Sequence, residues 1–129
     1  MKYYIEKTLN TDFESAISKT KEVLKAEGFG VLSEIDIDEK FKEKLNIDFR
    51  KYKIMGACNP ALAHQALQQE DKIGVMLPCN VIVQQLDDNK VEVAAIDPVA
   101  SLGSVENEKI SELAVTVKDK LGNAISALD

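Results

Sequence analysis

The chain has 129 residues, of which 45% are hydrophobic and 29% charged, and its formal net charge is −6. These values are typical of one globular domain and not of a disordered or fibrous chain. Because 22 acidic residues outnumber 16 basic ones and Arg50 is the single arginine, the charge argues against binding to nucleic acid or to an anionic membrane surface.

The N-terminus carries Lys2, Glu6 and Lys7 and has no apolar core, so we expect no secretory signal. No apolar run approaches the ~20 residues needed to cross a bilayer. We therefore expect a soluble, cytoplasmic protein whose two cysteines, Cys58 and Cys79, are reduced.

The chain opens with a β-prone segment, residues 3–8, followed by an amphipathic helix. Thr11 and Glu14 have the spacing of a capping box, which predicts the start of that helix. Gly28 predicts its end, because glycine adopts the left-handed conformation without steric cost.

A strand at 30–35 and a short helix carrying Phe41 and Leu45 follow, the helix capped by Asp36 or Asp38.

The next predicted strand, 49–58, ends at Asn59-Pro60, a favoured N-cap followed by a favoured first helical residue. We therefore expect a short helix from Pro60 to about Gln69. The β-prone run 73–86 contains Pro78, which predicts a bulge or a sheet edge.

Residues 87–89 predict a turn into an antiparallel strand at 90–96. Apolar residues at helical spacing from about Val105 then predict a long C-terminal helix. The resulting order is β-α-β-(α)-β-(α)-β-β-α. It predicts a single α+β domain over residues 1–129, with a largely antiparallel sheet covered on one face by the two long helices.

Four sequence blocks occur in the order seen in the bacterial and archaeal domain of unknown function 302 family, which the chain resembles. The motifs Cys-Asn-Pro at 58–60 and Leu-Pro-Cys-Asn at 77–80 are the specific ones. The blocks are Gly28–Asp36 with 42–45 and 48–50; Gly56–Pro60 with Ala63 and His64; Gly74 with Leu77–Val81; and Asp97-Pro98. The resemblance implies a helix-grip or TATA-binding-protein-like fold, often homodimeric, and no assigned activity or cofactor.

The candidate site comprises Cys58, His64 and Cys79. Cys58 precedes a helix N-cap, where free amides favour a thiolate. His64 is the single histidine and lies on the following helix, and Cys79 lies on the neighbouring β segment. If the two strands pair, the three side chains converge.

Three functions compete at this site. Cys58 and Cys79 form a thiol–disulfide pair with His64 as proton acceptor, or the three residues bind a metal with water or Asp97 as fourth ligand. In the third, an apolar pocket binds a small organic ligand with Asn59 and Asn80 as polar anchors. The alternative to all three functions is a structural role, in which Cys79 packs in the core as a small hydrophobic residue of an apolar strand. We expect a homodimeric small-molecule-binding module with a cleft near Cys58, His64 and Cys79. The alternative is a thiol-dependent redox or metal-binding protein that uses the same residues, and the residues do not decide whether there is catalysis.

Overall fold

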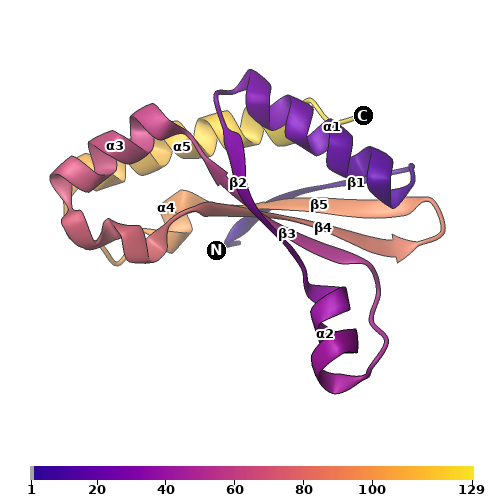
Figure 1. The fold of residues 1–129 in the computed structure, drawn as a ribbon. Coiled ribbons are helices and arrows are strands. Elements are labelled where there is room, and N and C mark those ends of the chain that lie inside the picture. Colours follow the sequence, from indigo (N-terminus) through magenta and orange to yellow (C-terminus); the bar gives the residue numbers. More distant parts are fainter. Residues whose placement is uncertain (1) are drawn as a thin grey trace.

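The computed structural model describes residues 2–129, which form one antiparallel sheet with helices against one of its faces (Figure 1). The five strands lie in the order β1-β5-β4-β3-β2. The strands are β1 (Tyr4–Leu9), β2 (Gly30–Asp36), β3 (Tyr52–Cys58), β4 (Cys79–Asp87) and β5 (Lys90–Ile96). The helices are α1 (Phe13–Ala26), α2 (Ile37–Leu45), α3 (Pro60–Gln69), the 3-10 helix η1 (Asp71–Met76), α4 (Pro98–Ser101) and α5 (Glu108–Ser126).

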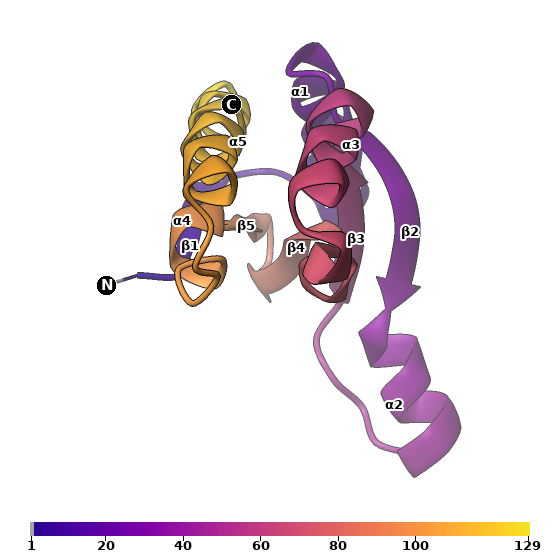
Figure 2. The same ribbon diagram turned by 90° about the vertical axis from the view of Figure 1, so that its left-hand side faces the viewer.

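The helices α1, α3 and α5 all lie on the same side of the sheet, and two views at right angles agree on this (Figures 1 and 2). The helix α2 projects from the opposite side, which no other helix covers in the described residues. The α+β class, the antiparallel sheet and the cover of one face by the two long helices are therefore confirmed.

The hydrophobic core lies between this sheet face and helices α1 and α5. Alternation along the strands explains it, because every second side chain points to the same face of a sheet. In β4 and β5 the alternating valines are completely buried. The larger core residues are Leu9, Phe13, Ile17, Leu24, Phe29, Met55, Val81, Val83, Val91, Val93, Leu121, Ile125 and Leu128.

The limits of α1 show one wrong prediction and one confirmed one. The N-cap is Asp12, not Thr11, and its carboxylate accepts a hydrogen bond of 2.8 Å from the amide of Ser15. Asp12 has the better geometry because its oxygen reaches the third helical amide directly. At the other end, Gly28 has φ +86°, as its predicted role requires.

The structure confirms the bounds of two predicted elements, the helix from Pro60 to Gln69 and the strand at 90–96. The strand predicted from residue 73 is wrong in its first part, because residues 71–76 form η1 and β4 begins at Cys79. Pro78 has no backbone N–H to donate to a β-ladder, so the pairing of β4 with its neighbours starts after this residue.

Two further boundaries differ from the predictions. The strand expected from residue 49 begins at Tyr52, because residues 46–51 return the chain from the projecting helix α2. The short helix α4 was not predicted. Its N-cap, Asp97, accepts from the amides of Val99 and Ala100 and is followed by Pro98, which is the same signal as Asn59-Pro60.

Within residues 2–129, no helix is both long and apolar enough to span a lipid bilayer.

Candidate functional site

An apolar cavity of about 50 Å³ lies at the end of the sheet where β3 ends and β4 begins. Helices α3, η1, α4 and α5 close it on the other sides. Almost all of its wall is hydrocarbon. The lining residues are Phe29, Ala57, Cys58, Asn59, Leu62, Ala63, Ala66, Ile73, Leu77, Pro78, Cys79, Pro98, Leu102, Ile110, Leu113, Ala114 and Val117.

A second hollow, a surface cleft of about 250 Å³, adjoins the cavity. The two share part of their walls, so the cleft lies directly outside the cavity. Residues on both walls are Leu77, Pro78, Cys79, Pro98 and Leu102. The cleft wall is also mainly apolar, and Asn80 and Ser101 are its polar residues.

The sequence of α3 explains why one side of this helix lines the cavity. Leu62, Ala63 and Ala66 lie on one face at helical spacing, and their small or branched side chains leave the space unfilled. The following 3-10 helix brings Ile73, which is 2% exposed, and then Leu77 to the same wall.

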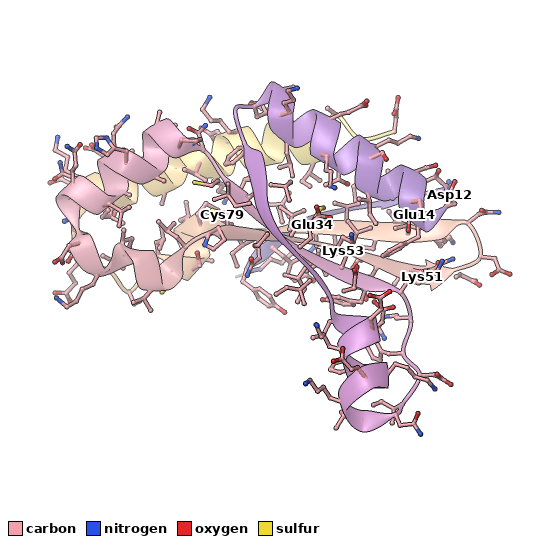
Figure 3. All side chains as sticks on the ribbon, viewed as in Figure 1. Asp12, Glu14, Glu34, Lys51, Lys53 and Cys79 are labelled. Carbon is pink, nitrogen blue, oxygen red and sulfur yellow. The ribbon has the colours of Figure 1, made fainter. Side chains whose placement is uncertain are left out.

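Cys58 and Cys79 both line the cavity from neighbouring strands. Cys79 pairs with Ala57 in the β3–β4 ladder, so Cys58 is the next residue along. Neither cysteine is in a disulfide. Figure 3 shows Cys79 at the end of the sheet nearest α3.

Burial, and to a lesser extent the nearby Cys58, raise the pKa of the Cys79 thiol to about 11. At neutral pH this thiol is therefore protonated, and a protonated thiol is a poor nucleophile and a poor metal ligand.

The two candidate asparagines have different positions. Asn59 lines the cavity, but its side chain is used by the fold: Oδ1 accepts from the amide of Leu62 at 3.3 Å and Nδ2 donates to the carbonyl of Glu27 at 3.4 Å. Asn80 is exposed and lies on the wall of the outer cleft. Asn80 is thus the asparagine with a side chain turned toward open space beside the site.

His64 is exposed and lines neither the cavity nor the cleft. A helix turns by about 100° per residue, which places position 64 roughly 150° around α3 from the face of Leu62, Ala63 and Ala66. The structure brings Cys58 and Cys79 together on one wall, and His64 points away from them.

Asp97, the fourth ligand considered for a metal, is already paired. It is 6% exposed, caps α4, and forms an ion pair of 3.0 Å with Lys118. Among residues 2–129, no group of three or more His, Cys, Asp or Glu side chains is placed to hold a metal ion.

The sequence reasoning missed the contribution of the C-terminal half to the site. α4 brings Pro98, Leu102 follows it, and α5 adds Ile110, Ala114 and Val117. These residues read as ordinary core positions of an amphipathic helix, and only the fold shows that they face a void. The Asp97-Pro98 cap signal was the one available pointer to α4.

Fold and site together define an α+β domain with an antiparallel sheet, one helical layer, and an apolar cavity at the sheet end. The family model described as "Domain of unknown function DUF302" matches residues 5–128, so the chain belongs to this family. The resemblance seen in the sequence blocks is confirmed.

The fold is also similar to a solved structure, described as an uncharacterized conserved protein DUF302 from Bacillus stearothermophilus. The two chains share 26% sequence identity with a TM-score of 0.91, and the alignment covers 100% of each. A search of curated proteins found no match.

Proposed function

We propose that this domain binds a small amphipathic molecule. Its apolar part would occupy the cavity beside Cys58 and Cys79, and its polar part would lie in the outer cleft near Asn80 and Ser101. The observation that carries this proposal is the shared wall of cavity and cleft, which sets an apolar space beside a cleft that carries the polar side chains of Asn80 and Ser101.

The size of the cavity sets the kind of apolar group. A volume of about 50 Å³ is a third of that of a ~150 Å³ apolar cavity that binds benzene. It suits a short alkyl chain or the edge of a ring. In the helix-grip arrangement that the family resemblance implies, the ligand lies between the sheet and the long C-terminal helix, and β3, β4 and α5 supply walls of this cavity.

A ligand larger than the cavity requires one of the enclosing helices to move. The helix α3 forms one side of the cavity and has no buried residue along its length, whereas η1 buries Ile73. Segments that bury little apolar surface open at lower free-energy cost than the core does. We therefore expect α3 to move outward to admit a longer chain.

A thiol-dependent function is the second candidate. Two free cysteines on one cavity wall favour it. The raised pKa of Cys79 opposes it at neutral pH, because the thiolate is the reactive species. A binding site in which the two sulfurs are soft, polarizable contacts needs no thiolate.

A series of straight-chain alcohols from ethanol to decanol tests the binding proposal, with affinity measured by NMR titration in reducing buffer. Each buried methylene contributes roughly 0.8 kcal/mol, or about a fourfold gain in affinity. Affinity should rise along the series and level off when the cavity is full. The length of the alcohol at which affinity levels off then gives the depth of the cavity that a ligand can occupy.

Two alanines of α3 provide matched variants. Ala63 lines the cavity, whereas Ala61 on the same helix is exposed. In the Ala63→Leu variant, affinity should level off at a shorter alcohol or binding should be lost. In the Ala61→Leu variant, the dependence of affinity on chain length should be unchanged. Absence of saturable binding by the wild-type protein, or equal effects of both variants, would contradict the proposal. Rapid reaction of both thiols with a disulfide reagent at pH 7 would favour the second candidate instead.

A further inference from the structure

Four helices begin at a capping side chain, and the two caps that are asparagines both hold α3. The caps of α1 and α4 are Asp12 and Asp97. The caps of α3 and α5 are Asn59 and Asn107. Aspartate and asparagine are about equally good N-caps, but only asparagine has an NH2 group that can donate to a second element. Both asparagines donate in this way, Asn59 at the start of α3 and Asn107 at its end.

Asn107 uses every hydrogen-bonding position of its amide group. Its Oδ1 accepts from the amides of Lys109 and Ile110, at 3.0 and 3.3 Å, and so caps α5. Its Nδ2 donates to the carbonyl of Gln69 and to Oε1 of Glu70, both at 3.2 Å. One side chain therefore fastens the end of α3 to the start of α5. Within residues 2–129, no other side-chain hydrogen bond or ion pair joins these two helices.

The helix α3 lies between two extended residues that can act as hinges. Asn59, before it, has φ −98° and ψ 103°, and Glu70, after it, has φ −150° and ψ 99°. Residues at the ends of an element commonly absorb the change in φ and ψ when a rigid helix moves. The bonds from Asn107 act at the second hinge, about 15 Å along α3 from the first. Breaking these bonds would free the end of α3 that is farther from β3.

The seam between α3 and α5 borders the cavity. On its outer side is a polar groove of about 360 Å³, lined by residues of both helices such as Gln65 and Glu112. Leu113 lines both this groove and the cavity, so the two hollows meet at its side chain. Figure 2 shows α3 and α5 side by side above the sheet. Separation of the two helices would therefore open the cavity along this seam.

We propose that Asn107 is a latch on the cavity: its bonds to Gln69 and Glu70 hold α3 against α5, and they break when a ligand too long for the closed cavity binds. The latch rests on the proposed binding function, because it regulates access to the same cavity. Asn107 lines neither the cavity nor the cleft, so it acts on the ligand only through the position of α3. One of its two bonds is exposed and the other partly buried, so water can replace both when α3 moves.

Asn107→Asp tests the latch with little change to the cap of α5. An aspartate oxygen still accepts from the amides of α5, but it cannot donate to α3, and its charge repels the carboxylate of Glu70. Hydrogen exchange of the backbone amides in α3 should accelerate by about tenfold, because two hydrogen bonds are lost. Exchange in β4 and β5 should be unchanged. Equal rates for α3 in wild type and variant would overturn the latch, and so would an equal acceleration in α3 and the strands.

Glu70→Gln serves as both control and rescue. Alone, it keeps an acceptor oxygen for Nδ2 of Asn107, so exchange in α3 should remain as in the wild type. Combined with Asn107→Asp, it reverses the bond, because the new amide group donates to the new carboxylate. The double variant should therefore regain part of the lost protection. Exchange as fast as in Asn107→Asp alone would contradict the pairing of these two side chains.

The series of straight-chain alcohols connects the latch to binding. Alcohols that fit the closed cavity should bind wild type and Asn107→Asp equally well. Longer alcohols should bind the variant about tenfold more tightly, because moving α3 costs less free energy once the two hydrogen bonds are gone. Affinity should therefore level off at a longer alcohol in the variant. If both proteins bind alcohols and level off at the same length, the latch is wrong and the binding function stands. If neither protein binds any alcohol, the binding function itself is contradicted, whatever the exchange rates.

Discussion

The ring of Pro78 packs against the bare Cα of Gly56: a Cβ atom added at Gly56 would lie 2.7 Å from Cγ of the proline. The same added atom would also collide with Oγ of Ser33 on the neighbouring strand. Gly56 pairs with Asn80 in the β3–β4 ladder. This close approach therefore lets Pro78, part of the wall shared by cavity and cleft, pack against β3.

Gly56→Ala should destabilise the protein by about 1–3 kcal/mol, because the extra methyl group must displace a proline ring and a serine hydroxyl. Urea denaturation measures the change. Gly30→Ala is the control, since Gly30 lies on the adjacent strand with no heavy atom within 4 Å of the added Cβ. Equal stability of the two variants would show that the contact with Pro78 is not tight.

The Cys79 thiol should make stability fall at alkaline pH. Its pKa is raised from an ordinary 9.0 to about 11 in the folded state. The folded state therefore holds this proton more tightly than the unfolded state does. The contribution of this proton to the free energy of unfolding is complete below pH 9. About 2 kcal/mol of it is lost as pH rises toward 11.

Comparison with Cys79→Ala isolates this effect from lysine and tyrosine titration. The difference in unfolding free energy between wild type and variant should narrow by about 2 kcal/mol between pH 8 and pH 11. A constant difference over that range would mean that Cys79 is not desolvated. The reaction rate of Cys79 with a thiol reagent should rise over the same interval.

Asn59 should matter for stability and not as a ligand anchor. Asn59→Ala removes the cap of α3 and the hydrogen bond to the Glu27 carbonyl, at a cost of about 1–2 kcal/mol. Asn59→Ser keeps a capping oxygen and should recover part of that loss. Thermal denaturation distinguishes them. Identical melting temperatures for all three proteins would contradict the assigned role.

The sequence predicted those parts of the fold that have strong local signals. Asn59-Pro60 predicted the start of α3 because cap and first-turn chemistry are set by two adjacent residues. The strand predicted from Ile73 was wrong because a short apolar run is compatible with both the helical and the strand period. In the structure Ile73 and Leu77 face inward while Val75 is 85% exposed, which is helical spacing.

The candidate site was predictable only in part. Strand pairing placed Cys58 and Cys79 on adjacent strands, as the hypothesis required. The position of His64 could have been read from the same helical spacing that places Leu62 and Ala66 inward. The void itself depends on how α4 and α5 pack against the sheet end, and no local pattern carries that information.

Xenon is the most direct probe of the central claim, that an enterable apolar cavity lies beside the two cysteines. Xenon binds apolar cavities through dispersion alone, and a crystal pressurised with the gas shows its position by anomalous scattering. We predict one strong xenon peak bordered by Cys58, Ala63, Leu77 and Cys79, which Ala63→Leu removes and Ala61→Leu does not. A wild-type crystal with no peak among these residues would contradict the account.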